Sequence, residues 1–171
     1  MRNIFAQKSR VLSSNQWKSQ EAENCPSVEC SFNDKTLCNY AENPLDEDVD
    51  LALGLPVGTV ILGWSVSKDK IGNSLTGITQ DAGQDGYFAY AGETTNSRAV
   101  FLLSSAHAFT VLEEVALKFK YHLSGKHGRL RVCLDTARMC PFELSGANVE
   151  LPRRIWKDAK IAIPKGTHLV S

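Results

Sequence analysis

A strict alternation of apolar and polar residues constrains this chain more than any other feature. Leu117, Phe119, Tyr121 and Leu123 alternate with Lys118, Lys120 and His122. Successive side chains of a β-strand point to opposite faces, so the pattern predicts a half-buried antiparallel strand with one apolar face. Turn residues follow at Gly125–Gly128, and a second alternating run follows them at 129–135. We therefore predict a β-hairpin over residues 115–136.

Other short apolar runs predict further strands, and helical periodicity is almost absent. The runs at 86–91 and 98–104 are rich in aromatic and branched residues and flank a polar loop, so we expect them to pair with each other. Strands are also expected at 59–64 and 160–163. Many short strands joined by glycine-containing and polar connections are typical of a two-sheet sandwich or jelly roll. We predict an all-β, antiparallel two-sheet β-sandwich.

The length of 171 residues suits a single domain that buries roughly 70% of its unfolded surface. We place Trp64 and Phe119 in the core between its sheets. Residues 1–24 show neither strand nor helix periodicity, so we expect a disordered leader, or a misassigned gene start, before a domain at 25–171. The leader lacks the apolar stretch of a secretory signal peptide. The longest run without charges, 51–67, contains glycine and proline and is too short to span a membrane.

The charges sum to zero, 19 basic against 19 acidic residues, but they are unevenly distributed. Positions 21–114 carry a net charge of −11 and positions 115–171 carry +7. A net charge of zero implies no polyanion partner, so we expect no binding to nucleic acid. The two segments either neutralise each other within one fold or mediate weak self-association through opposed patches. For the second case, Arg153 and Arg154 form the candidate interaction patch.

Four of the five cysteines form two close pairs in the sequence. Cys30 with Cys38, and Cys133 with Cys140, would each close a loop of fewer than ten residues. Chain-entropy reasoning assigns such a disulfide about 2.5 kcal/mol of stabilisation. Zinc is the alternative, but its usual ligand pairs are separated by two to four residues, so we favour two disulfides and an oxidising compartment. Cys25 is the odd cysteine, and we expect it to be free or paired outside this chain.

Around the first cysteine pair the sequence resembles the opening of a MAM domain. Cys30-Ser-Phe32, followed by Leu37-Cys38-Asn-Tyr40, is similar to the family pattern Cys-x-Phe-Glu and then Cys-x-Trp or Tyr. Further similarities follow in the family's order, at Trp64, Thr76-Gly77, Asp81, Gly86-Tyr87-Phe88, Leu102–Ser104, 117–125, Leu130–Val132, Trp156 and Pro164–His168. The resemblance covers roughly residues 30–171.

This resemblance implies a jelly-roll module of extracellular adhesion and interaction proteins, without catalysis or a cofactor of its own. It implies a part of a larger receptor or matrix protein, located outside the cell or in the ectodomain of a membrane protein. The partners would be other proteins, bound homophilically or heterophilically. Two departures matter: Asn33 stands where the family usually has Glu, and the chain stops at Ser171, before the family's usual last strand. We expect that strand to be missing.

Two other classes of function stay open. Tyr87, Phe88 and Tyr90 lie near a polar loop and would suit stacking on sugar rings in a carbohydrate-binding jelly roll. Alternatively, the chain is an accessory domain of a secreted or membrane-bound enzyme. No nucleophile or phosphate-binding motif is present in the sequence, so we predict that the chain is not an enzyme. The five carboxylates at 42–50 would form a solvated loop or contribute to a calcium site.

Overall fold

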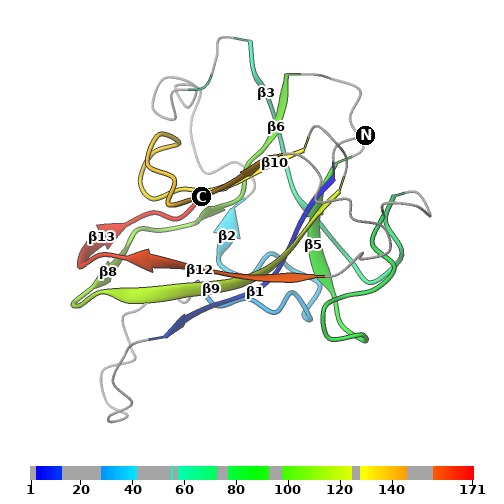
Figure 1. The fold of residues 1–171 in the computed structure, drawn as a ribbon, viewed down its shortest axis with the longest axis horizontal. Helices are drawn as coiled ribbons and strands as arrows, with labels where there is room; N and C mark the ends of the chain where they lie inside the picture. Colours follow the sequence, from blue (N-terminus) through cyan, green and yellow to red (C-terminus); the bar gives the residue numbers. More distant parts are fainter. Residues whose placement is uncertain are drawn as a thin grey trace.

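The computed structural model describes residues 3–12, 28–41, 55, 58–72, 77–92, 98–124, 128–145 and 156–171. These residues form strands and connecting segments without a helix, which confirms the predicted all-β class. The largest sheet is antiparallel and has the strand order β12-β9-β1-β5-β4 (Figure 1). Its strands are β1 (Asn3–Leu12), β4 (Ser65–Ser67), β5 (Phe88–Ala91), β9 (Val115–Ser124) and β12 (Lys157–Ile163).

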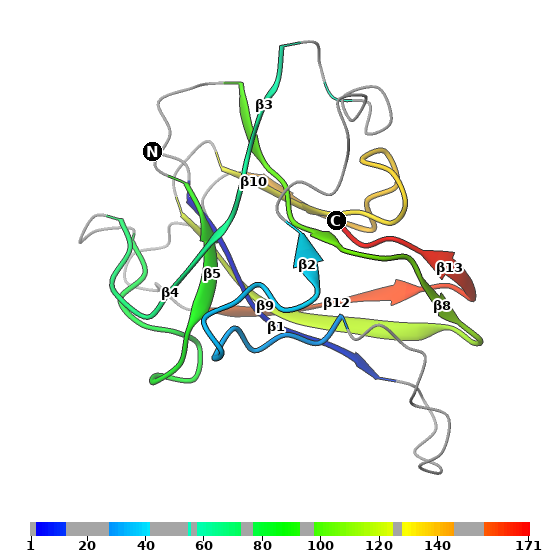
Figure 2. The same cartoon turned by 180° about the vertical axis from the view of Figure 1, so that it is seen from behind.

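The remaining strands form smaller pairs, visible from both sides in Figures 1 and 2. Three pairs are antiparallel: β2 (Tyr40–Ala41) with β7 (Ser104–Ser105), β8 (Phe109–Val111) with β13 (Gly166–His168), and β10 (Arg129–Val132) with β11 (Phe142–Ser145). One pair is parallel, β3 (Val60–Leu62) with β6 (Ala99–Phe101).

The main hydrophobic core lies between one face of the five-stranded sheet and the smaller pairs. The sheet contributes alternate residues of β9 and β12, namely Val115, Leu117, Phe119, Tyr121, Ile161 and Ile163. The facing residues are Phe109, Val111, Leu130, Leu134 and Val170. Phe142 closes the core at 5.1 Å from Phe119 and 5.3 Å from Tyr121, measured between ring centroids. Phe119 and Trp64 are 7% and 6% exposed, which confirms their predicted burial.

A second apolar cluster covers part of the opposite face of the same sheet. Phe88 of β5 is 0% exposed and packs with Ile78, and with the ring of Trp156 at 5.9 Å. The indole Nε1 of Trp156 donates to the carbonyl of Gln80 at 3.0 Å, which holds the ring in place. Both faces of β5 are therefore packed, because its Ala89 faces the cluster around Trp64 instead.

Residues 3–12 differ from the predicted disordered leader at 1–24, whereas residues 13–24 lie outside the described residues. Residues 3–12 form β1, which lies between β5 and β9 and pairs with both. Its register shifts between Gln7 and Arg10, as at a β-bulge. A bulge interrupts the two-residue period, so the sequence showed no strand pattern here. Cys25 lies outside the described residues.

The predicted hairpin at 115–136 and the predicted pairing of 86–91 with 98–104 are both wrong, although the strands themselves exist. β9 has β12 along one edge and β1 along the other, so the next strand, β10, pairs with β11 instead. Likewise β5 lies between β1 and β4, and β6 pairs with β3. A strand has only two hydrogen-bonding edges, and pairing with distant segments occupies both edges of β5. The predicted strands at 59–64 and 160–163 are confirmed by β3 and β12.

The C-terminal segment forms backbone hydrogen bonds with two other segments, one around Cys133 and one around Ser105. Ser171 and Cys133 exchange backbone hydrogen bonds of 2.6 and 3.0 Å, and Ser105 N donates to Val170 O at 2.8 Å. The Asp135 carboxylate adds a clasp, because its Oδ1 accepts from Leu169 N at 2.9 Å and its Oδ2 lies 3.0 Å from His168 Nδ1. The other ring nitrogen of His168 lies 2.9 Å from the carbonyl of Pro164. Both ring nitrogens of His168 therefore lie within hydrogen-bonding distance of an oxygen atom.

Because of this clasp, we expect the free energy of unfolding to decrease at acid pH. Burial alone would raise the pKa of Asp135, but the hydrogen bonds from His168 and Leu169 outweigh it and lower that pKa below its ordinary value. A carboxylate with a lowered pKa stabilises the fold above its unfolded-state pKa of about 3.9, and this stabilisation is lost as pH falls through the folded-state pKa. We expect the free energy of unfolding to decrease between about pH 5 and pH 3, and to decrease less in Asp135→Asn.

Urea denaturation at the two pH values measures the difference. Asparagine is the suitable replacement because Asp135 has a φ of 63°, a conformation that Asn tolerates almost as well as Gly. Equal losses of stability in the wild type and Asp135→Asn would show that the clasp does not contribute.

Candidate functional site

The first disulfide forms the base of the candidate site. The predicted pairs are both present: Cys30–Cys38 has a Cα–Cα distance of 5.8 Å, and Cys133–Cys140 closes the loop before β11. Cys30 is almost completely buried, whereas Cys38 lies at the surface. The loop between them therefore runs from the interior to the surface, and it presents its central residues to solvent.

Three segments that are distant in the sequence meet at this disulfide. Cys30 and Phe32 pack with Trp64, which precedes β4, and with Ala89 and Ala91 of β5. Trp64 contributes a large apolar surface that only the interior of the domain can cover. The cluster fixes the 30–38 loop against the β4–β5 end of the five-stranded sheet.

The loop turns without glycine, so several of its residues have unusual backbone conformations. Phe32, Lys35 and Cys38 have positive φ angles of 62°, 62° and 56°. Each such conformation costs a non-glycine residue roughly 1–2 kcal/mol. A hydrogen bond from Lys35 N to Phe32 O, at 3.0 Å, and one from Cys38 N to Thr36 Oγ1, at 3.2 Å, support the turns. The burial of Phe32 and the disulfide hold this loop in one shape.

Asn33 joins the loop to the segment that leads into β5. Its Oδ1 accepts a hydrogen bond from Tyr87 N at 3.0 Å. In the same segment, Gly83 N donates to the buried carboxylate of Asp81 at 2.8 Å. Gly86 lies between these groups, and a Cβ atom there would be 2.8 Å from both Asn33 Oδ1 and Asp81 Oδ2. The joint therefore requires glycine at position 86.

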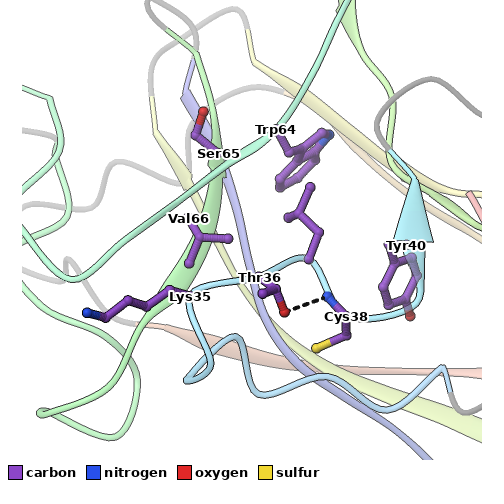
Figure 3. A pocket seen from close by; sticks show the side chains of 8 residues that line it. Lys35, Thr36, Cys38, Tyr40, Trp64, Ser65 and Val66 are labelled. Atoms are coloured by element: carbon purple, nitrogen blue, oxygen red, sulfur yellow. Dashed lines mark hydrogen bonds between the residues drawn. The ribbon is translucent and has the colours of Figure 1, made fainter.

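An open pocket of about 390 Å³ lies between the loop and β4. Figure 3 shows its lining, which consists of Lys35, Thr36, Leu37, Cys38, Tyr40, Trp64, Ser65 and Val66. We call it the loop pocket. Its lining combines the aromatic and aliphatic side chains of Leu37, Tyr40, Trp64 and Val66 with the hydroxyl-bearing Thr36 and Ser65, and in Figure 3 the ammonium of Lys35 is turned away from Trp64. The buried indole nitrogen of Trp64 has no hydrogen-bond partner among the described residues, and in Figure 3 it lies on the side of the ring turned away from Val66.

One charged residue, Lys35, lines the loop pocket, and a charged pair follows β4. The ammonium of Lys35 lies 5.6 Å from the centroid of the Tyr87 ring, within cation–π range. Lys68, just after β4, forms an ion pair of 2.8 Å with Asp85, and the hydrogen bond and charge of Asp85 raise the pKa of Lys68. Both groups are exposed, so this pair contributes little to stability. The pocket is suited to binding a ligand with both polar and apolar groups.

The sequence identified the framework of this site but not its surface. Cys30, Cys38 and Trp64 were predicted structural residues, whereas the sequence did not place Lys35 and Ser65 in one site, because their proximity depends on the packing of β4 against the loop. The predicted patch at 153–154 and the acidic segment 42–50 lie outside the described residues. Within the described part of the chain, no three His, Cys, Asp or Glu side chains gather as metal ligands would.

Comparisons with protein-family models, with curated proteins and with solved structures found no match in any of the three. Among the described residues, no helix has the length and apolarity needed to cross a membrane. The two disulfides indicate folding in an oxidising environment.

Replacement of Gly86 by alanine tests the joint beneath the pocket. The added Cβ would meet two oxygen atoms that hydrogen bonds hold in place, so we expect Gly86→Ala to reduce the free energy of unfolding by about 1–3 kcal/mol. Urea denaturation measures this loss. The control is Gly63→Ala, at an exposed glycine without a positive φ, where we expect about 0.5 kcal/mol or less. Similar small effects at both positions would contradict the described packing.

Proposed function

We propose that the chain is a non-catalytic interaction module of the MAM type, with a jelly-roll arrangement of its strands, that binds another protein through the loop pocket. The observation that carries this proposal is the convergence of the residues on which the MAM resemblance depends. Cys30 and Phe32 pack with Trp64, and Asn33, although it stands where the family usually has Glu, accepts a hydrogen bond from the backbone N–H of Tyr87. Motifs that lie more than fifty residues apart in the sequence thus hold the same loop in place, as expected if these motifs belong to one fold.

The loop pocket supports a role in binding proteins. Its lining combines aromatic and aliphatic side chains with hydroxyl groups, the mixture found where a protein side chain anchors an interface. The disulfide keeps the loop rigid, so little conformational entropy would be lost when a partner binds. The oxidising environment that the disulfides indicate supports an extracellular location, either as a secreted protein or as an ectodomain.

A carbohydrate-binding role has less support. It depended on Tyr87, Phe88 and Tyr90 as a stacking platform, but Phe88 is fully buried beneath Trp156. The ring of Tyr87 already has the ammonium of Lys35 over it. The described aromatic residues therefore form no open platform for a sugar ring at this position.

Binding of the purified, labelled chain to cell surfaces tests the proposal. At high salt, which suppresses purely electrostatic binding to polyanions, we expect binding that is lost when the cells are treated with protease and retained when they are treated with glycosidases. Ser65→Arg places a bulky charged side chain in the loop pocket, and we expect it to weaken binding by roughly tenfold or more, as the loss of an interface anchor does.

The matched control is Ser145→Arg, which makes the same change at an exposed strand serine in β11. We expect it to bind like the wild type. Equal weakening by both variants, or binding that survives protease but not glycosidase treatment, would contradict a protein partner at the loop pocket.

A further inference from the structure

The outward face of β9 and β12 carries a pair of opposed lysines. In the register of the two strands, Lys118 lies directly opposite Lys160, and both are exposed. The residues next to them in the sequence, Leu117 and Ile161, point to the other face of the sheet, into the main core. Directly opposed residues of antiparallel strands project from the same face with Cβ atoms about 5 Å apart. The side chains of Lys118 and Lys160 therefore leave the same face of the sheet at neighbouring positions.

This lysine pair is not neutralised within the described structure. Neither ammonium forms an ion pair with a described carboxylate, whereas the next opposed pair, Lys120 and Asp158, is bridged at 2.7 Å. Like charges directly opposite each other destabilise a sheet. In β1, the backbone of Arg10 is in register with Lys118. Three adjacent strands, seen side by side in Figure 1, thus carry basic residues at one level of the sheet.

The shape and composition of this face determine which partner it would suit. On the other side of the lysine pair, Ala116 lies opposite Ala162, so the face beside the lysines carries small side chains and offers no large apolar anchor. Stable protein interfaces need a well-packed core with large anchoring side chains, which this face lacks. Toward the other end of β9, Trp156 covers His122 at 6.0 Å between ring centroids and limits the open area. A linear anion with repeated charges would suit a basic face that lacks large apolar side chains.

We propose that this face, centred on Lys118 and Lys160, binds a sulfated polysaccharide. The ligand's sulfate groups would neutralise the opposed lysines and relieve their mutual repulsion. The disulfides favour this polyanion over nucleic acid, because they indicate an oxidising environment. The zero net charge of the chain does not exclude it, because attraction of a polyanion depends on the local charge of the face. The site is separate from the loop pocket, which involves β4 and the 30–38 loop.

Titration of the full chain with heparin at several salt concentrations tests the proposal. We expect binding near physiological salt that weakens steeply as salt rises, because bound counterions are released. In Lys118→Gln/Lys160→Gln the affinity should fall by roughly tenfold or more, and the salt dependence should become shallower. The charge-matched control, Lys70→Gln/Arg138→Gln, removes two exposed cations from other parts of the surface and should bind like the wild type.

Two further comparisons separate the explanations. Lys118→Arg/Lys160→Arg keeps both charges and should retain binding, and heparin should raise the melting temperature of every variant except the glutamine pair. Desulfated heparin should bind weakly, and duplex DNA should bind less tightly than heparin. Absence of heparin binding, equal losses in the glutamine pair and its control, failure of the arginine variant to bind, or tighter binding of DNA would each overturn the proposal.

Discussion

Backbone pairing of β1 with both β5 and β9 is the interaction on which the rest of the structure depends. β1 connects β12-β9, which carry one side of the main core, to β5-β4, which carry the cluster around Trp64. Without it, the sheet would consist of two separate pairs with unpaired edges, a state prone to association with other chains. The N-terminal strand therefore holds together the two halves of the domain, and with them both proposed binding surfaces.

The disulfide loop converts this framework into a site. The two ends of the loop are covalently joined, Phe32 and Cys30 are buried beneath Trp64, and Asn33 is bonded to the segment entering β5. The energetic cost of the left-handed residues in the loop is offset by these contacts. Consequently the exposed residues of the loop, Lys35 and Thr36, are held beside β4 in one arrangement. Rigid presentation of a small polar and apolar pocket is consistent with recognition of a partner.

Local patterns predicted elements well and their partners poorly. The alternation around Phe119 predicted β9 and the face that it buries, and the cysteine spacing predicted both disulfides. The predicted pairing was wrong wherever a strand pairs with segments distant in the sequence. The sequence of β9, for example, does not reveal that β1 and β12 occupy its two edges. β1 was missed since its bulge breaks the alternation. The loop pocket and the opposed lysines depend on contacts between segments far apart in the sequence, and periodicity carries no information on them.

Hydrogen–deuterium exchange of the backbone amides in residues 3–12 tests the central role of β1 most directly. In a strand that is paired along both edges, backbone amides that donate hydrogen bonds exchange slowly, at rates set by opening of the domain. The described pairing predicts that amides of β1 which donate to β5 or β9 exchange on the same timescale as the central amides of β9. Exchange of residues 3–12 at the rate of an unstructured peptide, while β5 and β9 stay protected, would contradict this account.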